Sequence, residues 1–82
     1  MVAKPSPSFS GHPLLIALGA VIRAERLAQG LSQEALADKA NIDRSYMGGI
    51  ERGEHNVAIM NLLKIADALD VKLSKFLGKC GL

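Results

Sequence analysis

The sequence predicts an all-α fold, a single domain of five helices. From Pro13 onward, apolar residues recur at the 3.6-residue period of a helix and nowhere alternate as they do in a strand. No proline follows Pro13, and glycines or capping residues separate the periodic segments. With 82 residues, 49% of them hydrophobic and 22% charged, the chain is long enough to bury the core of one domain.

The chain is expected to divide into three parts. Residues 1–12 contain two prolines, three serines and a glycine with almost no apolar periodicity, which is typical of a flexible N-terminal arm. Residues 13–78 form the helical domain, and residues 79–82 form a short C-terminal tail that is expected to fray.

The first helix is expected at about residues 13–29. Pro13 suits the first helical turn, where its missing N–H costs no hydrogen bond, and Gly30 suits the C-terminal stop. Its inward side is expected to consist of the following apolar residues: Leu18, Val21, Ile22, Ala24 and Ala28.

Two short helices are expected next, at residues 33–40 and 44–52. Ser32 and Asp43 are good N-caps for them, and Gly53 stops the second. Only residues 41–43 separate the two helices, so they are expected to cross steeply, as in a helix-turn-helix. The second helix would then project from the body and fit a DNA major groove about 12 Å wide. Any small helical bundle with a tight turn would show the same spacing.

The last two helices are expected at about residues 58–69 and 72–77. The first of them carries a strong apolar stripe, made of Ile59, Leu62, Leu63, Ala66 and Leu69. The second offers three large apolar residues, Leu73, Phe76 and Leu77.

Composition excludes several classes of function. The net charge of +2 is too small to indicate nucleic-acid binding by itself, and Cys80, the single cysteine, excludes a disulfide framework or a multi-cysteine zinc site. We expect no metal and no cofactor, and no catalytic set is visible, so the protein is not expected to be an enzyme. The apolar stretch 14–22 is too short to span a bilayer, and a cytoplasmic location is expected.

The run GLSQEALA at 30–37 is followed by IDRSYM at 42–47 and by IERG at 50–53. With this spacing, the motifs resemble the lambda-repressor/Cro-like (XRE) helix-turn-helix family. The resemblance extends through LLKIADAL at 62–69, and Ile22-Arg23-x-x-Arg26 looks like the first helix of the family. It covers about residues 14–77, and it implies a DNA-binding regulator whose recognition helix, about residues 44–52, enters the major groove.

The resemblance implies roles for individual residues. Arg44 and Ser45 open the recognition helix and are expected to contact bases, since a bidentate arginine on guanine is the commonest specific contact. Gln33 is expected to bind a phosphate and to buttress the first residue of the recognition helix. The loop after that helix offers three further candidates for phosphate contact: Arg52, His55 and Asn56.

Gly48 and Gly49 depart from the family, which often places a long polar side chain at the second position. Glycine inside a helix costs about 1 kcal/mol relative to alanine, so we expected a close approach of this backbone to bases or to a thymine methyl group. The same resemblance pairs Arg26 with Glu51, which would tie the first helix to the end of the third.

The expected partners are double-stranded DNA with a palindromic operator and a second copy of the chain. Phe76 and Leu77 are expected at the homodimer interface, because little chain remains to cover them. An alternative is an antitoxin that binds a toxin protein, with the N-terminal arm as its binding segment. A helical interaction module without DNA binding is a third class.

Overall fold

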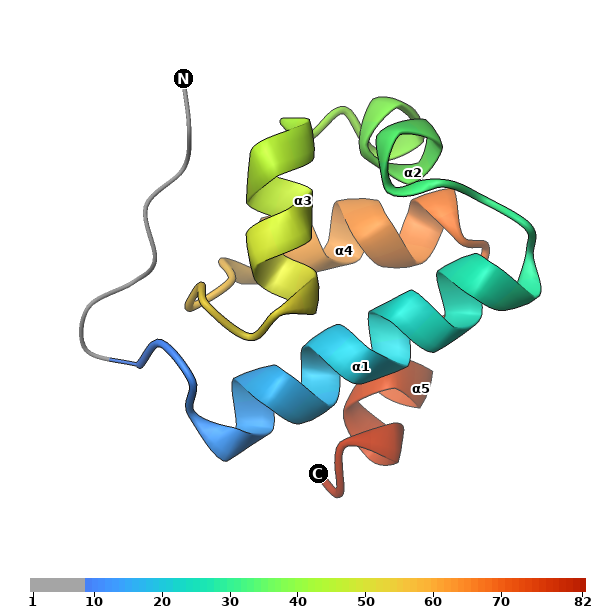
Figure 1. Ribbon diagram of the computed structural model, residues 1–82. Helices are drawn as coiled ribbons and strands as arrows, with labels where there is room; N and C mark the ends of the chain where they lie inside the picture. Colours follow the sequence, from blue (N-terminus) through green and yellow to red (C-terminus); the bar gives the residue numbers. More distant parts are fainter. Residues whose placement is uncertain (1–8) are drawn as a thin grey trace.

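The structure of the protein is a computed structural model, and it describes residues 9–82. It contains five helices in this order: α1 (Pro13–Ala28), α2 (Gln33–Ala40), α3 (Arg44–Glu51), α4 (Ile59–Ala68) and α5 (Leu73–Lys79). No strand occurs in residues 9–82, so the expected all-α, five-helix fold is confirmed. Helix α1 packs against α3 and α5, α2 packs against α3 and α4, and α4 packs against α5 (Figure 1).

All five helices end with the same backbone motif. The residue after each last turn adopts a left-handed φ of 54–86°, and these residues are Gly30, Asn41, Gly53, Asp70 and Gly81. The following amide then donates to the carbonyl five residues earlier, at 2.9–3.1 Å, which is the long bond of a Schellman motif. At the C-terminus, this bond joins the Leu82 amide to the Leu77 carbonyl. The tail therefore closes α5 with this bond, and the expected fraying of residues 79–82 stays a prediction.

The chain before α1 is also held in place where the structure describes it. The Gly11 amide donates to the Gly53 carbonyl at 2.8 Å, and the His12 amide donates to the Phe9 carbonyl at 2.8 Å. Nδ1 of His12 accepts the Leu14 amide and so caps α1. Residues 9–12 thus form a turn bonded to the loop after α3. Residues 1–8 of the expected arm lie outside the described residues, so the flexibility of the arm stays a prediction.

The core lies between α1, α4 and α5 and under the α2–α3 pair. Its fully buried large side chains are Ile22, Leu36, Met47, Ile50, Ile65, Leu69 and Phe76. Phe76 is only 1% exposed within its own subunit, so its predicted place at the dimer interface is wrong. The side chain points into the core that α1, α4 and α5 share, where no partner can reach it. Leu77 is half-buried.

Two of the predicted apolar stripes extend beyond the core. On α4, Ile59 is 60% exposed and Leu63 is 36% exposed, while the buried face begins only at Leu62. On α1, Ala24 and Ala28 are exposed, and Leu18 and Ile22 carry the inward face. Periodicity gives the direction of a helix face but not the point at which the neighbouring helices end.

Gly19 brings α1 and α3 into close contact. A Cβ at this position would lie 2.5 Å from the carbonyl oxygens of both Ile50 and Glu51, a distance that real Cβ atoms do not adopt. The missing side chain lets the last turn of α3 rest directly on α1. This approach places the end of α3 beside Arg26, two turns further along α1. Within residues 9–82, no helix is long and apolar enough to cross a bilayer.

Candidate nucleic-acid interface

The turn between α2 and α3 is short and is closed by backbone hydrogen bonds. Asn41 ends α2 with a φ of 55°, and the Ile42 amide donates to the Ala37 carbonyl at 2.9 Å. Asp43 follows at once as the N-cap of α3. Figure 1 shows the result: α2 is seen almost end-on beside α3, which runs from top to bottom of the view. The two helices therefore cross steeply, as the sequence predicts.

The N-terminus of α3 is capped by local bonds and is open to solvent. Oδ2 of Asp43 accepts the Ser45 amide at 3.1 Å, the Tyr46 amide at 3.2 Å and the Ser45 hydroxyl. The bond from the Ser45 hydroxyl, followed by the one from the Tyr46 amide, lowers the pKa of the Asp43 carboxyl below its usual value. Arg44 is exposed and Ser45 is half-buried beside it. The first turn of α3 can thus present a guanidinium without disturbing its own cap.

The C-terminus of α3 is anchored by a buried cluster of charged and polar groups. Arg26 donates from Nε to Oε2 of Glu51 at 2.8 Å and from Nη2 to Oε1 at 3.0 Å, and the two side chains are 9% and 3% exposed. Nη1 of Arg26 donates to the Leu31 carbonyl at 2.8 Å. The structure therefore brings together the two residues that the resemblance pairs, in the bidentate geometry that arginine and a carboxylate favour.

Gln33 belongs to the same cluster. Its Nε2 donates to Oε1 of Glu51 at 3.1 Å. The side chain therefore braces the last residue of α3, whereas the resemblance implies that it braces Arg44, the first. The difference follows from the steep crossing, which brings the start of α2 close to the end of α3.

Gly48 and Gly49 are both buried, in contrast to the expected exposed backbone. A Cβ at Gly48 would lie 3.1 Å from Nη1 of Arg52 and 3.5 Å from Oε1 of Gln33, and a Cβ at Gly49 would overlap the ring of His55. Neighbouring side chains therefore cover both glycines. We correct the expectation that their backbone itself approaches the bases.

His55 differs most from its predicted role. It is 4% exposed, so the expected phosphate contact from its side chain is wrong. Its ring lies over Gly49 with its centroid 4.7 Å from that of Tyr46, and its Nε2 is buried without a hydrogen-bond partner among the described residues. The ring supports the outer side of α3 from the loop. Asn56, the next residue, is exposed.

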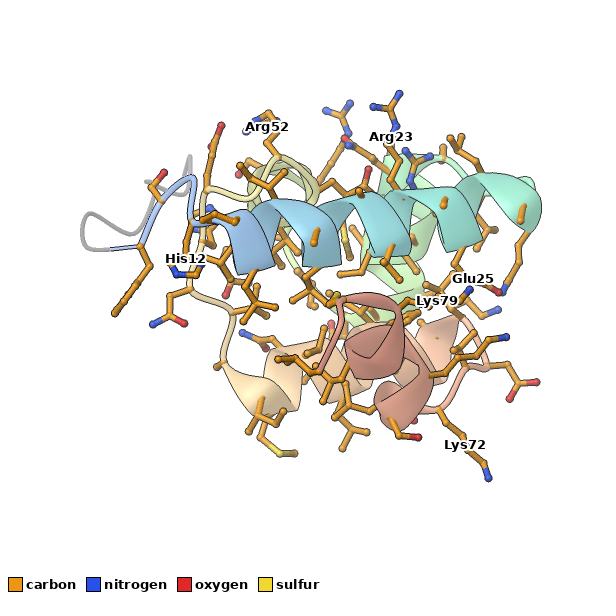
Figure 2. All side chains as sticks on the ribbon, turned by 90° about the horizontal axis from the view of Figure 1, so that it is seen from below. His12, Arg23, Glu25, Arg52, Lys72 and Lys79 are labelled. Carbon is orange, nitrogen blue, oxygen red and sulfur yellow. The ribbon has the colours of Figure 1, made fainter. Side chains whose placement is uncertain are left out.

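Arg52 lies at the C-cap of α3 and pairs with Glu54. Its Nε donates to Oε2 of Glu54 at 2.7 Å, and this hydrogen bond is the main reason that the pKa of the Glu54 carboxyl is lowered. Figure 2 shows Arg52 and Arg23, from α1, pointing to the same side of the molecule, with Lys72 on the opposite side. The sequence analysis assigned no role to Arg23, although it lies one turn before Arg26 in the motif of the first helix.

Within residues 9–82, no group of three or more His, Cys, Asp or Glu side chains could hold a metal ion. The described site consists of a helix that crosses α2 steeply, a capped N-terminus of that helix with an exposed arginine, and two further arginines on one side of the molecule. Helix-turn-helix proteins that bind DNA are the class defined by this arrangement.

Comparison with known proteins places the chain in that class. A family model described as Helix-turn-helix matches residues 22–76, and the chain belongs to this family. The control protein C.SmaI from Serratia marcescens is 39% identical over 61 residues, which cover 74% of this chain and 73% of that protein. The immunity repressor protein of Bacillus phage phi105 is 39% identical over 62 residues, covering 76% of this chain and 43% of the repressor.

A solved structure shows the same similarity. The crystal structure of the restriction-modification controller protein C.AhdI from Aeromonas hydrophila has 48% identity and a TM-score of 0.74. The match covers 76% of this chain and 94% of that chain. Controllers and repressors regulate transcription by binding DNA, and this chain is a DNA-binding transcriptional regulator of the same kind. These relatives give no support to the antitoxin alternative.

Proposed function

We propose that the protein is a controller-type transcriptional regulator that binds a two-fold symmetric operator as a homodimer. One observation carries the proposal: the open N-terminus of α3, with Arg44 exposed on a helix whose other end is anchored to α1 and α2. The relatives named above are controllers and repressors, which supports the assignment. We assign the protein no catalytic activity, and we place it in the cytoplasm, where it would meet DNA.

The contacts divide into two kinds. Arg44 and Ser45 are the candidates for base contact from the start of α3. Phosphate contact is assigned to Gln33, Arg23 and the exposed Asn56. For Gln33 the donors that remain are the second N–H of Nε2, whose first N–H is used by Glu51, and the backbone N–H groups at the start of α2. The backbone N–H groups at a helix start suit a phosphate oxygen.

Salt dependence tests this DNA mode. Only phosphates neutralised by Lys or Arg release counterions, and Arg23 is the one charged residue assigned to a phosphate in each subunit, so the slope of log affinity against log salt for the dimer should be about −2. Titration of a duplex with the protein at several salt concentrations measures the slope. An affinity that does not change between low and physiological salt would exclude the proposed mode.

The dimer requires a surface other than Phe76. Ile59, Met60 and Leu63 on α4 are 60%, 62% and 36% exposed, and we name them the α4 apolar patch. Large exposed apolar side chains that are adjacent on one helix usually mark an interface. A second copy is the occupant that the function requires, because a symmetric operator needs two recognition helices about 34 Å apart. Leu77, which is half-buried on α5, remains a candidate at the edge of this interface.

Sedimentation of variants tests the interface. Ile59→Ser together with Met60→Ser should convert the dimer to a monomer while the helical circular dichroism is kept, and operator binding should be lost. Leu27→Ser is the matched control, since Leu27 is 56% exposed on α1 and lies outside the patch. A double variant that stays dimeric would move the interface elsewhere, and the start of α1 around Leu14 and Leu15 would be examined next.

A further inference from the structure

Arg52 occupies the place on the outer face of α3 where a side chain at position 48 would stand. Side chains in a helix lean toward its N-terminus, so Arg52 at the C-cap lies back over the residue one turn earlier. That residue is Gly48, and Nη1 of Arg52 would be 3.1 Å from a Cβ there. The glycine therefore leaves open the space that the guanidinium fills.

Glu54 orients the guanidinium from one side. Nε of Arg52 donates to Oε2 at 2.7 Å and Nη2 donates to Oε1 at 3.2 Å. These bonds use two of the five N–H groups of the guanidinium, so two on Nη1 and one on Nη2 remain. The remaining groups form the outer edge of the fork, and the side chain is 59% exposed.

The geometry points to Arg52 as a second specificity-determining residue, which reads a guanine edge in the major groove, with Glu54 as its positioning residue. The outer edge of the fork matches the O6 and N7 acceptors of guanine. The inference rests on the proposed function, since it names a further residue that contacts bases of the same DNA site. It also explains how a recognition helix with two consecutive glycines can still present a long donor at its middle.

The charge of Glu54 favours a base over a phosphate as the partner. The Arg52 hydrogen bond lowers the pKa of the Glu54 carboxyl, so this group stays ionised at neutral pH. A carboxylate beside the guanidinium opposes the approach of a negatively charged phosphate, whereas the edge of a base carries no net charge. The pair is therefore suited to discriminate between base pairs, and it adds little to general attraction for DNA.

Selection of binding sites from random duplex DNA, with the full chain, tests the inference. The wild-type protein should select a symmetric consensus with a G·C pair at the position read by Arg52. Arg52→Lys keeps the charge but loses the fork, and it should weaken the preference at that position by about tenfold or more. Glu54→Gln should weaken the same preference but raise the affinity for unrelated duplexes, because the repelling charge is gone.

Gly48→Ala gives an independent test in which Arg52 itself is intact. The new methyl group would displace only the flexible end of Arg52, so the fold should persist. Gly78→Ala is the matched control, because a Cβ at this other helical glycine meets nothing within 4 Å. Both variants should be at least as stable to heat as the wild type, since alanine favours a helix. Only Gly48→Ala should alter the preference at the Arg52 position.

Two results would overturn the inference. If Arg52→Lys keeps the wild-type consensus and weakens all duplexes equally, Arg52 is a phosphate contact. If Gly48→Ala alters a different position from Arg52→Lys, Gly48 does not position the guanidinium. A wild-type protein that selects no consensus at all would contradict the proposed function itself, so the two failures are distinguishable.

Discussion

The two ends of α3 are held in different ways. At the C-terminal end, Glu51 is bonded to Arg26 and Gln33 from two other helices, and Gly19 lets the backbone of α1 touch the last carbonyls. At the N-terminal end, Asp43 caps the helix through bonds to its own neighbours, and Arg44 is exposed. The C-terminal end of α3 is therefore held by polar bonds to other helices, whereas the N-terminal end is capped from within its own segment and packs into the core through Met47.

The two ends of α3 therefore differ in their role: the anchored end sets the orientation of the helix, and the open end carries residues proposed to recognise DNA. Changes at the anchored end should cost stability and reposition the helix, whereas changes at the open end should alter DNA binding and leave the fold intact. The four predictions below test this separation, in decreasing order of the expected effect on the free energy of unfolding.

Arg26→Ala should have the largest effect. The Glu51 side chain is 3% exposed, and its charge would remain buried without its main partner. We expect a loss of about 3 kcal/mol in the free energy of unfolding. Denaturant unfolding of Arg26→Ala, Glu51→Ala and the double variant forms a double-mutant cycle. The double variant should recover part of the loss, and strict additivity of the two single effects would contradict the pair.

Gly19→Ala should destabilise the protein by about 1–3 kcal/mol, as overpacking does elsewhere. The added methyl group would meet two backbone carbonyl oxygens, which cannot move aside as a flexible side chain can. Gly78→Ala is again the control, and it should stabilise α5 by roughly 0.5–1 kcal/mol. If thermal unfolding gives the same sign for both variants, the close approach of α1 and α3 is not what requires a glycine.

Arg44→Ala should leave the free energy of unfolding within about 0.5 kcal/mol of the wild type, because the side chain is exposed. Discrimination at one symmetric position of the operator should fall by about 1–3 kcal/mol. Gln33→Ala, at the anchored end, should instead weaken binding to all sequences about equally. Site selection from random DNA measures both effects, and an unchanged consensus for Arg44→Ala would make Arg44 a phosphate contact.

Asp43→Asn should have the smallest effect, and it should be visible only in acid. The pKa of Asp43 is lowered in the folded protein, so its carboxylate stabilises the fold above the usual value of about 4. That contribution is lost as the pH falls through the lowered pKa. Asparagine is an equally good N-cap, so the melting temperatures of variant and wild type should agree near pH 7. The variant should lose less stability than the wild type near pH 3.

The parts of the fold that the sequence predicts correctly are those set by residues close together in the chain. The bounds of α2 agree with the prediction, and α3 ends one residue earlier than predicted. Ser32 and Asp43 cap their helices through amides two or three residues away, so these boundaries depend on neighbours in the chain. The resemblance to the family adds the one long-range pair, Arg26 with Glu51, that local signals do not contain.

The errors concern residues whose surroundings are set by distant parts of the chain. His55 looks like an exposed loop residue, but the turn at Gly53 directs its ring onto Gly49. Phe76 lies near the end of the chain, but α5 turns it into the core. Both outcomes depend on which surface lies opposite the residue, and for Phe76 the local sequence carries no signal. Gly49 was the available signal for His55, since an unexplained helical glycine often marks a neighbour that needs the space.

The common ending of the five helices has a consequence for the speed of folding. A segment of six residues determines where each helix ends, because the long hydrogen bond of each Schellman motif spans only five positions along the chain. Segments of this length form on the submicrosecond to microsecond timescale, before any distant contact is made. Helical domains dominated by such short-range contacts fold in microseconds to milliseconds. A newly synthesised copy would therefore reach its binding-competent state long before the next copy leaves the ribosome, which requires several seconds for 82 residues at about 5–20 residues per second.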